Sequence, residues 1–291
     1  MSTSESASSR ESCLQIKRIT PKLGAEVSGV DLKNLDAQSI AAIRQAFREH
    51  FVLVFRDQEL SRAQHKAFGR LFGELHLHPA KTHLGLAGDP EIFDIEITAD
   101  TKVANGEAWH SDLSCEPVPP IASALYLTEV PAGGGGDTLF ANMQAAFAAL
   151  SPPVQKLLTG LTAYHNGFKD LQAYGFEPKP HQTYPCASHP MVIRHRDTGA
   201  PVLFINEPFV ERVNELGKHE SAALLDMLYR HIERETRCQC RVQWQRNTLV
   251  LWDNQAVHHH AVWDYYPESR SGERVTIQAQ RPPAAYGDGA V

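Results

Sequence analysis

Short apolar runs of strand length recur along this chain and dominate its pattern of hydrophobic and polar positions. Residues 51–55 are a continuous apolar run, short enough for a fully buried strand. A shorter run at residues 14–19 also predicts a strand. Further runs, most of them bounded by Gly, Pro, Asp or Asn, lie at residues 92–97, 122–127, 191–194, 202–205, 242–244, 248–252 and 275–279. The pattern therefore predicts a chain that is mainly β.

Apolar residues with helical spacing occur at fewer places. Asp36 is suited to cap a helix whose apolar positions begin at Ile40. Ser61 with Gln64 is a capping-box signature for a helix that ends near residue 72. Two more helices are predicted at residues 151–160 and 219–235. Parallel βαβ units would need a helix after nearly every strand, so the pattern favours a double-stranded β-helix, or jelly roll, with flanking helices.

Length and composition describe one ordinary globular domain. The chain has 291 residues, of which 42% are hydrophobic and 21% charged. It contains neither an internal repeat nor a linker, so we expect a single domain at residues 14–283, between a disordered tail at residues 1–13 and a C-terminal tail at residues 284–291. A formal net charge of -6 without a long basic run argues against nucleic acid as a partner. A small molecule is the better expectation.

Several features predict a cytoplasmic protein. The five cysteines are scattered without the paired spacing of a disulfide framework or a zinc ribbon, which favours a reducing compartment. Residues 1–12 are rich in Ser and Glu and lack the apolar stretch of a signal peptide. No later segment is apolar enough to span a bilayer, so we expect no membrane association.

The triplet His110-Ser111-Asp112 is the first candidate for chemistry. On a strand, side chains two residues apart share one face, so His110 and Asp112 could hold one ion. Non-haem Fe(II) oxygenases bind iron through two histidines and one carboxylate, which leaves positions open for a cosubstrate and for oxygen. The triplet alone also arises by chance on solvated strand edges. A second histidine is available in the run at residues 258–260, but the residues by themselves leave open which one faces the metal.

Several motifs together resemble the taurine dioxygenase family, whose members are Fe(II)- and 2-oxoglutarate-dependent enzymes with a double-stranded β-helix. The resemblance extends from about residue 16 to residue 283. It is carried by residues 72–79, Trp109-His110-Ser111-Asp112, Gly135-Gly136-Asp137-Thr138-Leu139, Trp252-Asp253-Asn254-Gln255, His259, Arg270 and Arg274.

The resemblance implies an iron centre and a site for the cosubstrate. His110, Asp112 and His259 would bind Fe(II), and His258 and His260 would be packing or supporting residues. Arg270 and the Thr138 hydroxyl would hold the distal carboxylate of 2-oxoglutarate, since the planar guanidinium matches a carboxylate. Arg274 would lie near the iron end of the cosubstrate and the charged head of the substrate. The glycine run at residues 133–136 lacks the lysine of a phosphate-binding loop, so we expect it to be a tight turn that presents Thr138.

The family reaction consumes O2 and 2-oxoglutarate, releases succinate and carbon dioxide, and hydroxylates a substrate carbon. Asp112 favours hydroxylation, because related halogenases lack this carboxylate. The nearest resemblance suggests a small sulfonate such as taurine, whose hydroxylation beside sulfur leads to sulfite and an aldehyde. His78 and Arg274 would bind the sulfonate. The chain departs from the taurine pattern at Lys81, where a tyrosine is expected, and at Gly106, where an asparagine is expected and Asn105 lies one place away. Lys81, which could pair with a carboxylate or a sulfate, and Asn105 are further candidates for contacts to the substrate.

Other substrates and roles are therefore open. An alkyl sulfate, an aryloxyalkanoate or an amino-acid-derived carboxylate could undergo the same chemistry, and a non-catalytic jelly-roll metal-binding protein is a further alternative. Phe204, Asn206 and Phe209 are candidates for the pocket wall, although core packing explains the two phenylalanines equally well. Irregular segments at residues 98–108 and 168–187 are candidate lids. The family resemblance also suggests a homo-oligomer, either a dimer or a tetramer.

Overall fold

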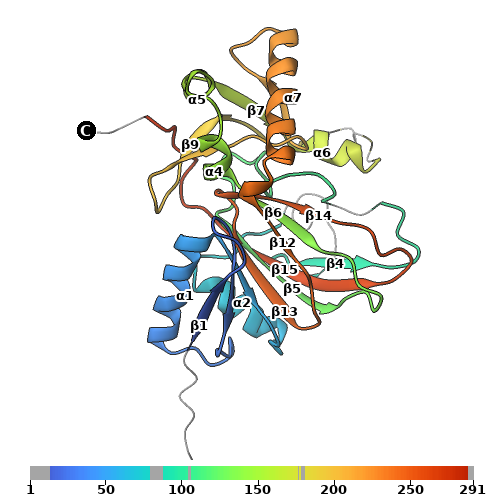
Figure 1. Ribbon diagram of the computed structural model, residues 1–291. Helices are drawn as coiled ribbons and strands as arrows, with labels where there is room; N and C mark the ends of the chain where they lie inside the picture. The colour runs from blue at the N-terminus through green and yellow to red at the C-terminus, as the bar shows by residue number, and fades with distance from the viewer. Residues whose placement is uncertain (1–13, 79–87, 104–105, 176, 178–180, 288–291) are drawn as a thin grey trace, which may run out of the picture.

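The computed structural model describes residues 14–78, 88–103, 106–175, 177 and 181–287 (Figure 1). Residues 1–13 and 288–291 lie outside this part, so the predicted N-terminal tail and the end of the C-terminal tail are not described, and the predicted domain bounds stay a prediction. Within the described residues, no helix is both long enough and apolar enough to cross a membrane.

A seven-stranded sheet forms the base of the molecule. Every pair of neighbouring strands in it is antiparallel except β2 and β3, which are parallel. The sheet runs in the order β1 (Gln15–Arg18), β2 (Ala25–Ser28), β3 (Val52–Phe55), β13 (Thr248–Asp253), β5 (Ala122–Glu129), β15 (Arg270–Ile277) and β4 (Phe93–Ile97). All residues of β3 and β13 are buried, because each strand is covered on both faces.

Two helices cover one face of this sheet, as Figure 1 shows. They are α1 (Ala37–His50) and α2 (Arg62–Arg70). Both predicted caps are confirmed: the Asp36 side chain accepts a hydrogen bond from the Ser39 N–H, and Ser61 with Gln64 forms the full capping box. These caps begin the helices where the chain leaves the sheet, which lets each apolar stripe pack onto it.

A smaller sheet packs against the other face. It consists of β12 (Gln239–Val242), β6 (Thr138–Asn142) and β14 (Val257–Ala261), in that order. Phe140 on β6 and Trp252 on β13 lie in the core between the two sheets. Two facing antiparallel sheets confirm the predicted jelly roll, which is mainly β with flanking helices.

A third layer of short elements closes one end of the sandwich. It is organised around α7 (Lys218–Arg234), the long helix that stands upright in Figure 1. Leu225, Leu228 and Ile232 of α7 pack into its core. The other elements are α4 (Met143–Ala148), α5 (Pro152–Thr159), β7 (Thr162–Asn166), α6 (Gly167–Ala173), β8 (Cys186–Pro190), β9 (Val192–Arg194), β10 (Pro201–Leu203), β11 (Val210–Val213) and the short 3-10 helix Thr236–Cys238.

Three local predictions were wrong. Asp112 lies in a turn rather than on a strand, and only His110 pairs, through an isolated bridge to His259. Segment 168–187 contains most of α6, which begins because the Asn166 side chain caps it. The strand expected at residues 242–244 ends at Val242. Strand β14 was not predicted, since its three histidines interrupt the apolar pattern that marks a strand.

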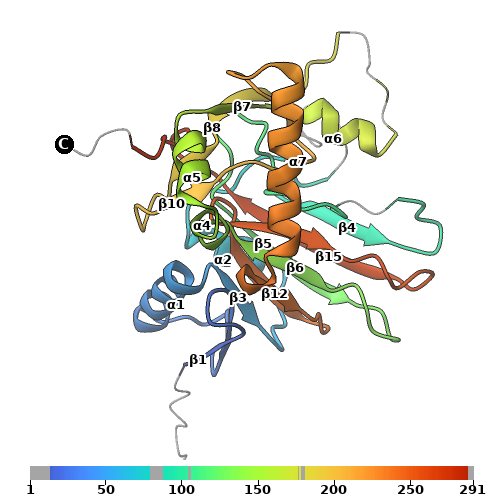
Figure 2. The same ribbon diagram turned by 45° about the horizontal axis from the view of Figure 1, so that its top comes forward.

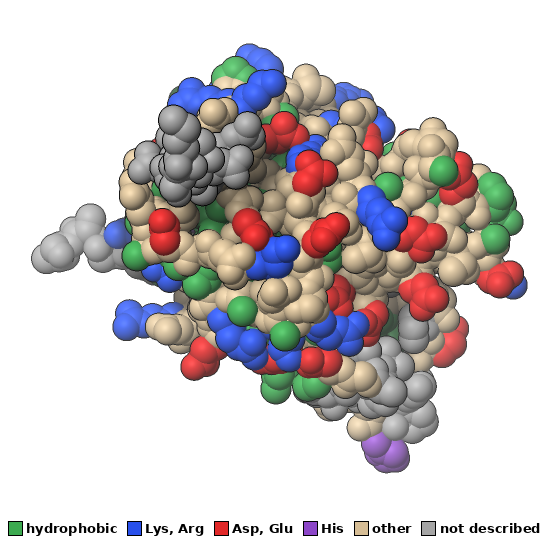
Figure 3. Space-filling view, turned by 90° about the horizontal axis from the view of Figure 1, so that it is seen from below, with side chains coloured by type: hydrophobic (Ala, Val, Ile, Leu, Met, Phe, Trp, Pro, Cys, Tyr) green, Lys and Arg blue, Asp and Glu red, His purple; other side chains and the backbone are tan. Residues whose placement is uncertain are grey.

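Acidic and basic side chains are interspersed on the face of the molecule in Figure 3. Such a mixed surface lacks the concentrated positive field that phosphate backbones require. The expectation that nucleic acid is not a partner stays a prediction.

Candidate active site

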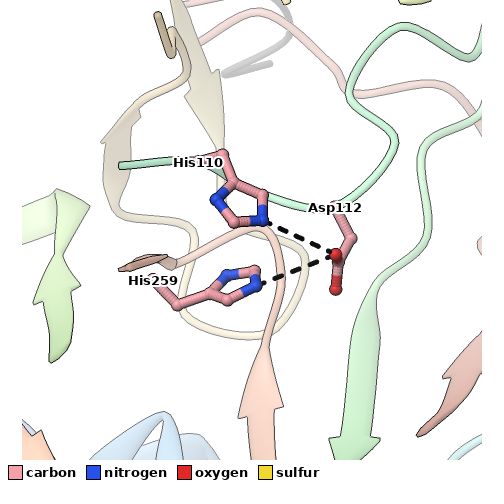
Figure 4. A group of neighbouring side chains, drawn as sticks. All are labelled: His110, Asp112 and His259. Atoms are coloured by element: carbon pink, nitrogen blue, oxygen red, sulfur yellow. Dashed lines mark ion pairs between the residues drawn. The ribbon is translucent and has the colours of Figure 1, made fainter. Parts of the chain in front are cut away.

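His110, Asp112 and His259 come together between the two sheets (Figure 4). Asp112 Oδ1 lies 4.0 Å from His110 Nε2 and 3.8 Å from His259 Nε2. The backbones of His110 and His259 exchange hydrogen bonds of 3.0 and 2.8 Å, which hold the two imidazoles side by side with ring centroids 4.0 Å apart. Three ligand atoms of the types that iron prefers therefore converge on one point.

The two imidazoles are suited to bind a metal ion. His110 Nδ1 lies 2.7 Å from the Ala108 carbonyl oxygen, so Nδ1 carries the proton and donates it. This tautomer leaves the lone pair on Nε2, the atom that faces Asp112. Burial lowers the pKa of His110 and of His259, which keeps both rings neutral near pH 7.

Asp112 is held as an ionised carboxylate with one oxygen toward the histidines. Its Oδ2 accepts a hydrogen bond of 2.8 Å from the Ser123 hydroxyl, and its Oδ1 accepts one of 2.5 Å from Arg274 Nη1. Burial by itself would raise the pKa of Asp112, but the charge of Arg274 and the two nearby histidines hold it well below its ordinary value. In this arrangement Arg274 supplies the positive charge that a metal ion would supply.

Asn254 fixes the turn that carries Asp112. Its Oδ1 accepts a hydrogen bond of 2.7 Å from the Asp112 N–H, and its Nδ2 donates to the carbonyl oxygens of Asp112 and Pro120 at 2.9 and 3.0 Å. Sequence reasoning quoted Asn254 only as part of a motif. The signal for its role was a polar residue directly after the buried strand β13.

Arg270 presents a buried positive charge with free donors. Its side chain is 6% exposed, and neither Nε nor Nη2 has a hydrogen-bond partner among the described residues. Burial lowers the pKa of Arg270, while a hydrogen bond with Tyr265 opposes this effect. A buried guanidinium with unpaired N–H groups is costly unless an anion binds there.

Trp244 connects Arg270 to Thr138. Trp244 Nε1 donates a hydrogen bond of 3.0 Å to Thr138 Oγ1, and the Arg270 guanidinium lies 5.5 Å from the centre of the indole ring. The Thr138 hydroxyl proton stays available for an anion, because the oxygen accepts the Trp244 bond. Sequence reasoning missed Trp244, which lies just beyond β12.

The glycine run forms the turn that leads into β6, as predicted. Gly136 has a φ of +69°, and a Cβ there would lie 3.2 Å from the Tyr265 ring and 3.4 Å from Arg270 Cδ. Only glycine allows this approach without displacing the neighbours of the Arg270 guanidinium.

Phe93 packs against both residues that were predicted to bind the substrate anion. Its ring centroid lies 4.4 Å from that of His78 and 4.9 Å from Arg274 Cζ. The structure therefore brings His78 and Arg274 to one aromatic side chain of β4. Lys81 and Asn105, the other two predicted polar contacts, lie outside the described residues.

Phe204, Asn206 and Phe209 support the loop that follows Asp112. Asn206 Nδ2 donates to Ser114 Oγ at 2.8 Å, and Asn206 Oδ1 accepts from the Phe209 N–H at 3.1 Å. All three are buried, and Phe204 stacks on His165. Their predicted role as a pocket wall stays a prediction.

The run of histidines divides as the family resemblance implies. His259 joins His110 and Asp112, whereas His260 makes an edge contact with the Trp109 ring, with centroids 5.6 Å apart. Burial lowers the pKa of His258 to about 3, so this ring is a neutral packing residue.

A second group with metal-ligand chemistry lies elsewhere, at His195, Asp197 and Asp253. Its donor atoms are already engaged. Asp253 Oδ2 accepts hydrogen bonds from His195 Nε2 at 3.1 Å and from Arg196 Nη2 at 2.6 Å, and its Oδ1 accepts from Arg196 Nη1 and from the N–H groups of residues 255 and 256. His195 Nδ1 accepts from the Thr198 N–H at 3.2 Å. This group is a structural network.

Comparisons with known proteins agree with this geometry. Residues 15–276 match the family model "Taurine catabolism dioxygenase TauD, TfdA family". An "Alpha-ketoglutarate-dependent sulfonate dioxygenase" of Saccharomyces cerevisiae is 34% identical over 283 residues, which cover 92% of this chain and 68% of that protein. An "Alpha-ketoglutarate-dependent sulfate ester dioxygenase" of Pseudomonas putida is 31% identical, covering 92% of this chain and 91% of that protein. The crystal structure of a taurine dioxygenase from Burkholderia xenovorans has a TM-score of 0.78 and 32% identity, covering 92% of each chain.

Proposed function

The chain belongs to the taurine catabolism dioxygenase family, and we propose that it hydroxylates a small organic sulfonate at the centre formed by His110, Asp112 and His259. Membership in this family makes the protein an enzyme that depends on Fe(II), 2-oxoglutarate and O2. The residues that perform each task, and the substrate, are our proposals.

We assign the iron to His110 Nε2, His259 Nε2 and Asp112 Oδ1. Their convergence and the neutral state of both imidazoles support this assignment. Three protein ligands on one side of the metal leave room for the cosubstrate and oxygen. Ser123 and Asn254 orient Asp112, so the carboxylate does not need to reorganise when the metal binds.

The unpaired donors of buried Arg270 are the observation that carries the enzymatic proposal. A protein that only stored metal would have no use for a buried guanidinium with unpaired donors. We assign the distal carboxylate of 2-oxoglutarate to Arg270 and the Thr138 hydroxyl, with Trp244 holding both in place.

With Fe(II) bound, O2 would be the oxidant: 2-oxoglutarate would be converted to succinate and carbon dioxide with one oxygen atom, and the other would enter a substrate C–H bond as hydroxyl. The residues of the chain bind and orient the reactants. Arg274 donates a hydrogen bond to Asp112, and its guanidinium packs against the Phe93 ring. This position would let Arg274 hold the anionic head of the substrate beside the metal. His78 also packs against the Phe93 ring and is our second candidate to bind the substrate anion.

A sulfonate is our first candidate for the substrate because the yeast relative is named a sulfonate dioxygenase. Hydroxylation beside sulfur would then release sulfite and leave an aldehyde. The relative that acts on sulfate esters favours an alkyl sulfate as the second candidate. An aryloxyalkanoate or an amino-acid-derived carboxylate would need the same two anion-binding residues.

The test is anaerobic addition of Fe(II) and 2-oxoglutarate, followed by a screen of organic anions for succinate release under air. The proposal predicts a visible charge-transfer band from the iron chelate and sulfite from at least one sulfonate. The Arg270→Met variant should bind 2-oxoglutarate at least about a hundredfold more weakly, the loss of a bidentate charged pair. Arg230→Met is the matched control, since Arg230 lies exposed on α7 in a pair with Asp226. No band with the folded wild-type protein would reject the proposal.

Two predictions stay open. A dimer or tetramer would be recognised by sedimentation of the full chain, and a cytoplasmic location by fractionation of cells that produce it.

A further inference from the structure

Helix α6 lies directly against the loops that carry two of the proposed iron ligands. At its first residue, Gly167, a Cβ would lie 3.0 Å from Cys115 Sγ, three residues after Asp112. At its other end, the Tyr174 hydroxyl accepts a hydrogen bond of 3.0 Å from the Gly106 N–H. A Cβ on Gly106 would in turn lie 3.4 Å from His110 Cε1. Both views of the fold show α6 beside α7 at one end of the two sheets (Figures 1 and 2).

Asp170 lies on the face of α6 that these contacts define. Gly167, Asp170 and Tyr174 are separated by three and four residues, which places them on one side of a helix. The two outer residues contact the loops of Asp112 and His110, so Asp170 lies on the side of α6 that packs against these loops.

The charges around Asp170 support this placement. Burial and the Asp112 carboxylate raise the pKa of Asp170 to about 6. Burial, Glu116 and Asp170 raise the pKa of Cys115. Burial and Asp170 also raise the pKa of the Tyr174 hydroxyl. Asp170 therefore lies within electrostatic range of a proposed ligand and of residues at both ends of α6.

No described residue satisfies the Asp170 carboxylate with a hydrogen bond or an ion pair. Its neighbour Lys169 is engaged elsewhere, because Lys169 Nζ donates to the carbonyl oxygens of Glu207 and Val210 at 2.5 and 2.6 Å. A partly buried carboxylate next to a second carboxylate is unfavourable unless a cation compensates it. Arg274 compensates Asp112, and Asp170 has no such residue among those described.

We propose that Asp170 determines substrate specificity by binding the protonated amine of a zwitterionic substrate, while Arg274 holds the anionic end. The inference rests on the proposed function and names a narrower substrate class, the amino-substituted organic anions. Arg274 binds Asp112, and α6 packs against the loop that follows Asp112, so the two ends of the substrate would bind at different places around the metal centre. The carbon chain between them would then pass in front of the iron.

The test compares matched pairs of substrates that differ only in the amine. Taurine is compared with ethanesulfonate, and 4-aminobutyrate with butyrate, by KM and kcat for succinate release. The wild-type enzyme should prefer the amino member of the pair that it accepts. The Asp170→Asn variant should raise KM for that member about ten- to hundredfold, as expected for loss of one charge-assisted hydrogen bond, and should leave KM of the partner unchanged.

Two further variants separate recognition of charge from a structural effect. Asp170→Glu keeps the charge and should retain the preference for the amine, even if Asp170→Asn lowers stability. Asp226→Asn, an exposed carboxylate on α7, should change neither KM. If isethionate, which carries a hydroxyl in place of the amine, loses as much affinity as taurine in Asp170→Asn, the site recognises a hydrogen-bond donor and the charge proposal is wrong.

The outcomes also distinguish this inference from the proposed function. If the wild type forms the chelate band but turns over no amino member, or prefers neither member of a pair, only the role of Asp170 is rejected. If the band is absent, the proposed function fails. An equal rise of KM for both members of a pair would make Asp170 a general structural residue.

Discussion

The molecule contains two buried groups of histidine and aspartate that differ in how their atoms are satisfied. At Asp253, both carboxylate oxygens are bound by Arg196, and His195 uses both ring nitrogens within the protein. At Asp112, one oxygen and two imidazole Nε2 atoms converge, with Arg274 as the balancing charge. Both groups have ligand atoms within 4.8 Å of one another, so proximity alone does not separate them.

The difference lies in the surroundings of each carboxylate. Arg274, which donates to Asp112 through Nη1, has an Nε without a partner among the described residues, and so do Nε and Nη2 of Arg270 at the start of the same strand, β15. The described residues that bind Asp253 do so through donors that are used in these bonds, so no such donor is left for a ligand. Unsatisfied buried donors therefore mark a site built for ligands, whereas satisfied ones mark a structural network.

The largest effect is expected from removing the ligand charge. Asp112→Asn should lower metal affinity and turnover at least about a hundredfold, since changes to groups that merely support metal ligands already cost 10–100-fold. An amide is a poorer ligand than a carboxylate, and Arg274 would lose its partner. Metal titration followed by the chelate band and by succinate release measures this effect. Retention of turnover within a few-fold of wild type would remove Asp112 from the iron site.

An aspartate-to-asparagine substitution in the group of His195, Asp197 and Asp253 should change the stability of the fold and leave metal binding unchanged. Asp253→Asn should lower the free energy of unfolding by about 3 kcal/mol, because it leaves Arg196 and His195 without their buried partner. Metal affinity should not change. Urea denaturation measures the loss, and Asp197→Asn is the control within the same group. The Asp197 side chain is 38% exposed and pairs with Arg196 at 3.3 Å, so its loss should cost less than about 1 kcal/mol.

Metal binding should stabilise the protein through one group only. Anaerobic Fe(II), at about 100 times its dissociation constant, should raise the unfolding free energy of the wild type by about 2.7 kcal/mol. Asp253→Asn should show the same increment from its lower baseline, and Asp112→Asn should show at most about 0.4 kcal/mol. Thermal unfolding with and without metal measures these increments. An increment that disappears in Asp253→Asn would place metal at the second group.

The smallest expected effect is the pH dependence of the second group. Burial would raise the pKa of Asp253, but Arg196 and His195 hold it well below its ordinary value. The unfolded chain then binds a proton more readily, so the stability from Asp253 is present above the unfolded pKa and declines as pH falls toward the folded pKa. The gap between wild type and Asp253→Asn should narrow by about 1 kcal/mol from pH 5 to pH 3. A gap that widens in acid would contradict this sign.

Much of the fold could be predicted because it depends on local interactions. The caps at Asp36 and Ser61 and the buried run of β3 follow from spacing and side-chain chemistry within a few residues. Strand β14 escaped prediction because its three histidines interrupt the apolar pattern, and the burial of His258 and His259 depends on distant segments that no local pattern records. Asp112 left the expected strand because Asn254, distant in sequence, holds it in a turn.

The sequence by itself determined the jelly-roll class, the family and the three residues that meet at the candidate metal centre. Motif order and the family resemblance carry this information, since residue types and spacing alone left open which histidine of residues 258–260 faces the metal. Only the tertiary structure decided that Asp253 is satisfied while Arg270 is not, that Trp244 joins Arg270 to Thr138, and that α6 packs against the loops of Asp112 and His110. These facts depend on contacts between distant segments, and burial sets the free energy of each polar group only after those segments have packed.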